Sequence, residues 1–318
     1  MKHFKNILVA TDTRLDAHPI VEEAALIAQR NGATLKLVDV VPDFSWLARM
    51  TVTDHESLRQ LMGREKQTKL DELAAAIRKH GVDVEAKVLW GKTSVEIIRE
   101  VLRGQHDLLL RVAKGHESRH TGFFGATGRR LLRDCPCAVW LVSAADKLVY
   151  THVMGCIDTS SDSEIDAELN AKVYELASTI SQQHKARFTL LHAWYIDAES
   201  MLSHRMSRAD MAKLHEERKE FVETRLDAFL QSRETGGRPD NVELVKSDAP
   251  LLIPAYTKER SVDLVVMGTV ARSGLTGMVI GNTAERILDD LQCSVLALKP
   301  NSFVSPITYS EYINPTTE

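Results

Sequence analysis

The sequence lacks the features that mark several large classes of protein. Only four of its 318 residues are cysteine, and they lie in or beside apolar segments, which indicates buried, reduced thiols and no disulfide framework. The beginning of the sequence holds a four-residue apolar run before Thr11, far shorter than the roughly 20 residues that cross a membrane. The 40 basic residues do not outnumber the 44 acidic ones, so no basic face for nucleic acid is expected. We therefore expect a cytoplasmic protein without a membrane or nucleic acid as partner.

Several catalytic motifs are also missing. No Gly-x-Ser-x-Gly elbow is present, and neither are the His-x-Gly-His and Ser-Gly-Gly-x-Asp strings that related folds use for adenylyl transfer. Cys135 and Cys137 form a Cys-x-Cys pair, which we interpret as packed thiols and not as a redox or zinc site because the spacing is not Cys-x-x-Cys. We predict no conventional catalytic residues.

Two short strings resemble catalytic motifs. Residues 116–120 read His-Glu-Ser-Arg-His, which are the letters of the zinc motif H-E-x-x-H, but the string lies in a glycine-flanked loop and not on a helix. We predict no metal site there and leave open adventitious metal binding by His116 and His120. The string WGKTS at 90–94 lacks the first glycine of a phosphate loop and is interpreted as a turn that leads into a helix.

The chain contains an internal repeat. Its length is about twice that of a typical domain, and its 44% hydrophobic and 26% charged residues are ordinary for globular proteins. When residues 107–142 are laid over residues 263–298 without a gap, nine of the 36 pairs are identical. The segments NILVATD and HVMGCID also match, at an offset shorter by ten residues. The second copy therefore carries about ten additional residues in its middle.

Apolar runs alternate with helical periodicity in both copies, which predicts βαβ units in a parallel sheet. Helical spacing places Leu70, Leu73, Ala74 and Ile77 on one face, with Gly81 as the stop, and does the same for Val222, Leu226, Phe229 and Leu230. The predicted strands are 6–11, 35–41, 83–89, 107–112, 138–142, 151–157, 187–194, 242–246, 263–268 and 294–299.

We predict an α/β fold with two tandem, open, doubly wound, five-stranded parallel sheets of the Rossmann-like type. The first domain covers residues 1–145, the second covers 149–300, and residues 301–318 form a C-terminal tail on the surface. Such sheets bind ligands at the carboxyl ends of the strands, where the winding reverses.

A glycine-rich loop follows the fourth predicted strand of the second half. Its glycines allow close approach of the backbone to a ligand, and the loop leads into a helix near Asn282 whose first N–H groups can bind an anion. Asn282 also suits the N-cap, with Glu285 three residues later in a capping-box pattern. The loop glycines are Gly268, Gly274, Gly277 and Gly281.

These residues resemble a motif of the universal stress protein family. Its adenine-nucleotide-binding branch carries Gly-x-x-Gly-x9-Gly-Ser/Thr in this loop and an Asp at the end of the first strand. Here Gly268, Ala271 and Gly281-Asn282 occupy that spacing, and Asp158 ends the first strand. The resemblance covers nearly the whole chain and is greatest to tandem members of the E type. It implies a fold like that of the adenine nucleotide alpha hydrolases.

The resemblance also implies a site for ATP or ADP in the second half, with Mg²⁺ as a companion that the nucleotide could bring. It places Asp158 and the backbone of Ala193 near the base and Gly268 near the ribose. The phosphates would be lined by Ala271, Gly281, Asn282 and Thr283.

No nucleotide is expected in the first half. Val112 stands in the place of the first motif glycine, where its branched side chain would fill the sugar position, and Ala126 replaces the usual Ser or Thr. The positions that still match the motif are Gly115, Gly125, Asp12 and Val40.

Two functions from different classes stay open. The first is a stress-response protein whose second half binds an adenine nucleotide as a regulatory switch and is, at most, a slow ATPase. The second is a nucleotide-free scaffold that holds a protein or an apolar ligand in the cleft between its domains, and Ala271 and Asn282, which depart from the motif, keep it open. The apolar last strands CAVWLV and CSVLALK predict an intramolecular pseudo-dimer, and a homodimer is also compatible with them.

Overall fold

The computed structural model describes residues 4–15, 17–43, 54–113, 123–143, 149–233, 238–269 and 280–308. These residues form two compact units. The first unit holds the described residues up to Val149 and those from Ser294 onward, and the second holds those from Tyr150 to Cys293. None of the described helices combines the length and the low charge that spanning a bilayer requires.

The first unit is built on a mostly parallel sheet. Its order is β3-β2-β1-β4-β5, with every neighbouring pair parallel, and β10 then lies antiparallel beside β5, with Leu296 opposite Trp140. Except for the edge strand β3, the strands are mostly buried, as expected for a sheet that is covered on both faces. Their bounds are β1 Asn6–Ala10, β2 Thr34–Val41, β3 Val84–Trp90, β4 Leu108–Val112, β5 Ala138–Val142 and β10 Ser294–Leu298.

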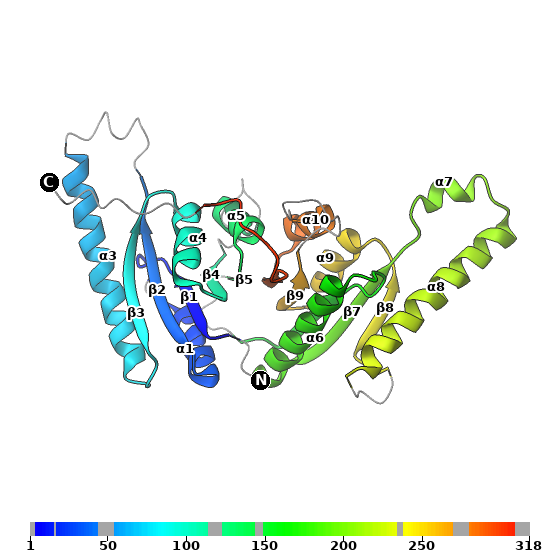
Figure 1. The fold of residues 1–318 in the computed structure, drawn as a ribbon, viewed down its shortest axis with the longest axis horizontal. Coiled ribbons are helices and arrows are strands. Elements are labelled where there is room, and N and C mark those ends of the chain that lie inside the picture. Colours follow the sequence, from blue (N-terminus) through cyan, green and yellow to red (C-terminus); the bar gives the residue numbers. More distant parts are fainter. Residues whose placement is uncertain are drawn as a thin grey trace. The chain divides into compact units, whose positions relative to one another are not determined.

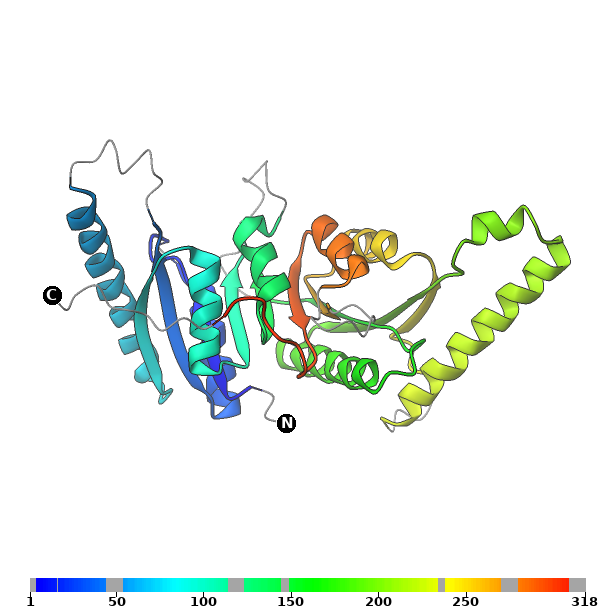
Figure 2. The same ribbon diagram turned by 45° about the horizontal axis from the view of Figure 1, so that its top comes forward.

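Two pairs of helices cover this sheet. Helices α1 (Pro19–Asn31) and α3 (His55–Arg78) contact each other and pack on β1, β2 and β3. Helices α4 (Thr93–Gly104) and α5 (Gly125–Asp134) form the other pair, which lies side by side in Figures 1 and 2.

The second unit has four parallel strands in the order β9-β6-β7-β8. Helix α6 packs on β6, β9 and β7, while α9 and α10 contact each other, as Figures 1 and 2 show. The strands are β6 His152–Ile157, β7 Arg187–Trp194, β8 Val242–Lys246 and β9 Leu264–Gly268. The helices are α6 Glu164–His184, α7 Glu199–Ser203, α8 Arg208–Gln231, α9 Ala249–Glu259 and α10 Asn282–Asp290.

The predicted α/β class and the tandem arrangement are confirmed. All ten predicted strands are present, and each bound differs by at most one residue. The predicted helical faces are buried as well, through Leu70, Ala74 and Ile77 in α3 and through Val222, Leu226 and Leu230 in α8. Gly81 has a φ of +77°, so it adopts the left-handed conformation expected just beyond the end of a helix.

The last described segment packs on the first unit. β10 groups with the first unit, because it supplies a hydrogen-bonded partner to the apolar edge of β5. The segment after β10 is also packed: Phe303 is only 6% exposed, and the Ser305 hydroxyl donates to the Asp134 carbonyl. The described part of the predicted surface tail therefore belongs to the fold. The pseudo-dimer of the two halves and the homodimer stay predictions.

Candidate functional site

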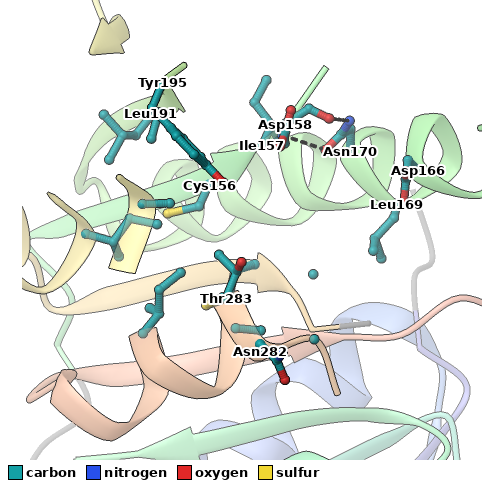
Figure 3. A pocket seen from close by; sticks show the side chains of 18 residues that line it. Cys156, Ile157, Asp158, Asp166, Leu169, Asn170, Leu191, Tyr195, Asn282 and Thr283 are labelled. Carbon is teal, nitrogen blue, oxygen red and sulfur yellow. Dashed lines mark hydrogen bonds between the residues drawn. The ribbon is translucent and has the colours of Figure 1, made fainter. Parts of the chain in front are cut away.

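A cavity of about 360 Å³ opens in the second unit at the carboxyl ends of its strands. β6 lies between β9 and β7, so the winding of the chain reverses beside it, and ligands bind at such a switch point in open α/β sheets. The volume is at the lower end of the about 300–1,000 Å³ found for small-molecule pockets. Figure 3 shows the side chains that line it. They come from Cys156, Ile157, Asp158, Asp166, Leu169, Asn170, Leu191, Ala193, Tyr195, Ala249, Ile253, Met267, Gly268, Gly281, Asn282, Thr283, Ala284 and Ile287.

Six of the seven residues predicted to bind nucleotide line this cavity, although more than 120 residues separate the first from the last. Ala271 lies outside the described residues. The six are Asp158 after β6, Ala193 in β7, Gly268 at the end of β9, and Gly281, Asn282 and Thr283 at the start of α10.

Asp158 is held in place through its backbone. Its N–H donates to Asn170 Oδ1 at 3.1 Å, and Asn170 Nδ2 donates to the Asp158 carbonyl at 2.7 Å. The carboxylate accepts hydrogen bonds from the backbone N–H and the hydroxyl of Ser160, and 40% of the side chain stays exposed. Asp158 therefore presents an oriented carboxylate to the cavity, ready to accept further hydrogen bonds.

His192 lies behind this carboxylate and is completely buried. Its Nε2 is 3.4 Å from Asp158 Oδ1 and makes no hydrogen bond within the described part of the chain. Burial, assisted by the positive charge of Arg218, lowers the pKa of His192 to about 4. The ring is therefore neutral at pH 7 and adds no positive charge to the site.

The N-terminus of α10 supplies the opposite wall of the cavity. Gly281 is the N-cap, and no side chain of the described residues caps the helix. Asn282 is therefore the first helical residue, one position after the predicted N-cap. In Figure 3 the Thr283 side chain points toward the cavity, while that of Asn282 points away from Asp158. Because the first N–H groups of a helix have no partner within the helix, this wall can receive an anion.

Gly268 lets the Leu169 side chain pack close to the backbone. A Cβ atom at this position would lie 2.4 Å from Cδ2 of Leu169, which projects from α6. Gly268 thus lets the Leu169 side chain close one side of the cavity. The resemblance explains this glycine by the close approach of a sugar. The contact with Leu169 is a second explanation, based on packing.

Sequence reasoning missed several lining residues, among them Asn170 and Leu169 from α6 and Tyr195 after β7. A signal existed for Asn170, which recurs at helical spacing with the buried Val173 and Ala177 and so places an amide on an apolar face. No sequence pattern around Tyr195 indicated that it would line a cavity. Burial and the nearby Asp197 and Asp248 raise its pKa, so its hydroxyl stays protonated at pH 7.

The corresponding edge of the first unit is built from charged groups. The Asp12 carboxylate, which matches Asp158, accepts hydrogen bonds from Nε and Nη2 of Arg14, at 2.8 and 2.5 Å. The hydrogen bond from Arg14 lowers the pKa of Asp12 to about 2, against the opposing effect of burial. Arg14 thus pairs with the carboxylate that matches Asp158 in the first unit.

The metal-like string at His116 and His120 lies outside the described residues. Within the described ranges no group of three or more His, Cys, Asp or Glu side chains is arranged to hold a metal ion.

Comparisons with known proteins give one consistent result. The model of the universal stress protein family matches residues 3–143 and again residues 150–299. The chain is 27% identical to universal stress protein E of Photorhabdus laumondii and 27% identical to universal stress protein E of Escherichia coli K12. In both cases the match covers 96% of this chain and 98% of the relative.

Solved structures agree with this result at the level of the fold. A putative universal stress protein from Pseudomonas aeruginosa UCBPP-PA14 has a TM-score of 0.68 at 23% identity, covering 94% of this chain and 95% of that one. The functionally unknown protein PA1789 from Pseudomonas aeruginosa PAO1 has a TM-score of 0.70 at 23% identity, covering 94% of both chains.

Proposed function

Because the chain belongs to the universal stress protein family, a family of the stress response, and carries two such domains, we propose that its second half binds an adenine nucleotide, ATP or ADP, as a regulatory switch. One observation carries the proposal. Residues that the sequence motif assigns to base, ribose and phosphates, far apart along the chain, line a single cavity at the switch point of the sheet.

The base would lie between β6 and β7. There the Asp158 carboxylate, oriented by Asn170, would accept a hydrogen bond from the exocyclic amino group of adenine. The backbone of Ala193 would contact the base from the neighbouring strand. The carboxylate therefore acts as the selective element, because it rejects bases that present only acceptors at that point.

The phosphates would lie at the start of α10. The described lining contains no lysine or arginine, so the positive potential there comes from the N–H groups of the uncapped helix and from its dipole. We expect modest affinity for this reason, with a Kd in the micromolar to millimolar range (about −4 to −8 kcal/mol). Such a site responds to changes in nucleotide concentration, as a switch requires.

Leu169 favours a second candidate function. Its side chain rests on Gly268 at the ribose position, and the cavity also has apolar walls from Ile157, Met267 and Ile287. An apolar ligand in this cavity, bound without nucleotide, is the competing hypothesis. A nucleotide has to displace Leu169 or lie beside it.

Titration calorimetry of the full chain with ATP and ADP separates the two. We expect one nucleotide per chain and a loss of affinity of at least tenfold in Gly281→Val. The Gly281 φ of −70° allows valine, so this variant adds bulk at the cavity without backbone strain.

Thr283 and Thr127 occupy equivalent positions of the repeat and provide a matched control. Thr283→Val should weaken ATP binding, whereas Thr127→Val should leave it unchanged. No heat with millimolar ATP in the parent chain, or equal effects of the two threonine variants, would reject the nucleotide hypothesis.

A further inference from the structure

Two thiols lie against each other at the beginning of β5. Cys135 follows α5, Pro136 separates it from Cys137, and the two Sγ atoms are 3.5 Å apart. A disulfide bond is about 2.05 Å long, so the sulfurs need to approach by about 1.5 Å to join. Cys135 is fully buried, while Cys137 is partly exposed. Cys137 is therefore the member of the pair that lies nearer to solvent.

A buried lysine accompanies this pair. Lys299 follows β10, and its Nζ donates to the carbonyls of Cys135 and Arg133, at 2.6 and 2.8 Å. It also lies over the ring of Phe303, 4.1 Å from the ring centroid. An ammonium group fixed beside a thiol stabilises the thiolate, which is the nucleophilic form of cysteine.

The charges around the two thiols act in opposite directions. Burial opposes ionisation of Cys135, but its hydrogen bond with Cys137 and the charge of Lys299 outweigh burial and lower its pKa. Burial and Cys135 raise the pKa of Cys137. Of the carboxylates that face the pair, Asp134 is paired with Arg130 and Arg133, and Asp107 lies before β4. Of the two sulfurs, Cys135 therefore has the surroundings that favour a thiolate.

The repeat shows that this arrangement is particular to the first half. Cys137 matches Cys293, but the position of Cys135 is occupied by Leu291 in the second copy. Burial raises the pKa of Cys293 to about 12, so that thiol is inert. The second half packs with a single cysteine at this point of the fold. Packing alone therefore does not explain why the first half has Cys135 as well.

Although the Cys-x-Cys spacing alone indicates packed thiols, we propose from this geometry that Cys135 and Cys137 are a site of reversible oxidation, in which a peroxide converts the dithiol held beside Lys299 into an intramolecular disulfide. The Cys135 thiolate attacks one oxygen of hydrogen peroxide, the O–O bond breaks, and the hydroxide that leaves takes up a proton, which gives a sulfenic acid on Cys135. The Cys137 sulfur then attacks that sulfur, the S–O bond breaks, and the thiol proton leaves with the hydroxide as water. Two thiols become one disulfide, and one peroxide becomes two water molecules.

Peptide mapping of the full chain tests this proposal. The reduced protein is treated with hydrogen peroxide, its remaining thiols are alkylated, and trypsin releases residues 134–147 with both cysteines. We expect this peptide to be two hydrogens lighter and not alkylated, and reduction with dithiothreitol should restore alkylation. Cys156 and Cys293 should stay alkylated throughout. Alkylation of both sulfurs after peroxide, or sulfinic acid on Cys135 without the disulfide, would overturn the proposal.

The pH dependence of this oxidation tests the role of Lys299. Lys299→Gln keeps a donor for the two carbonyls but removes the charge, so disulfide formation should slow several-fold at pH 7.5 and recover near pH 9. Cys293→Ser serves as the matched control and should leave the rate unchanged. Identical pH profiles for the parent and Lys299→Gln would remove Lys299 from the site.

Discussion

The two halves carry different side chains at one equivalent position. This position lies directly before Val40 in β2 and directly before Ala193 in β7. In the first half this residue is Asp39, which is buried with Lys66 as its ion-pair partner and also accepts hydrogen bonds from the backbone N–H and hydroxyl of Thr13. In the second half it is His192, which is also buried and has Asp158 Oδ1 3.4 Å from its Nε2 as its one ionic neighbour among the described residues. A buried charge needs such partners, whereas a neutral imidazole can be buried without them.

His192 should make the protein sensitive to acid. Its pKa falls from 6.5 to about 4 on folding, so between these values the unfolded chain binds a proton that the folded chain does not. Stability is therefore lost as pH falls through this window. Relative to His192→Gln, the parent should lose about 2–3 kcal/mol more unfolding free energy between pH 7.5 and 4.5, measured by urea denaturation. Parallel losses in the two proteins would mean that His192 does not titrate in this way.

At the scale of elements, the end of α5 is completed by residues from the end of the chain. Lys299 donates to the carbonyls of Arg133 and Cys135, and Ser305 donates to that of Asp134. The last carbonyls of a helix have no partner within it, so these donors satisfy groups that would otherwise be buried and unpaired. The segment that follows β10 is therefore a structural part of the first unit.

Substitutions of the neighbouring residues Phe303 and Val304 test whether the segment after β10 stabilises the first unit. Phe303 is buried and Val304 is 73% exposed. Phe303→Ala should lower the unfolding free energy by about 3 kcal/mol, because it removes a buried ring, while Val304→Ala should change it by less than about 0.5 kcal/mol. Denaturation in urea measures both. Equal effects would show that the segment is not packed in solution.

For the whole molecule, the sequence predicted the strands and helices that recur in the two halves. It did not predict contacts that depend on how distant segments pack together. Buried parallel strands are short apolar runs, so all ten could be located with nearly correct bounds. The motif assigned Asp158, Gly268 and Gly281 to one site, and all three line the same cavity. The contact of Leu169 with Gly268 could not be foreseen, because it depends on how α6 lies over β9. The sequence marked the two apolar last strands as edges in need of a cover, but it did not give the antiparallel register in which β10 pairs with β5.

The first unit is consequently assembled from two separate stretches of sequence. A fragment of residues 1–149 lacks β10 and leaves the apolar edge of β5 unpaired. We expect this fragment to self-associate through that edge, because unpaired edge strands recruit further strands. Light scattering after size-exclusion chromatography should show a concentration-dependent dimer, with the full chain run as the reference. A strictly monomeric, folded fragment would contradict this expectation.

The antiparallel pair of β5 and β10 also bears on how the protein is made. A ribosome that works at about 5–20 residues per second needs roughly 8–30 s to proceed from the end of β5 to the beginning of β10. During this interval the second copy is still being translated, and the edge of β5 in the nascent first sheet has no β10 to pair with. The first sheet is then completed only after β10 has been made, and chaperones have that interval in which to shield the open edge.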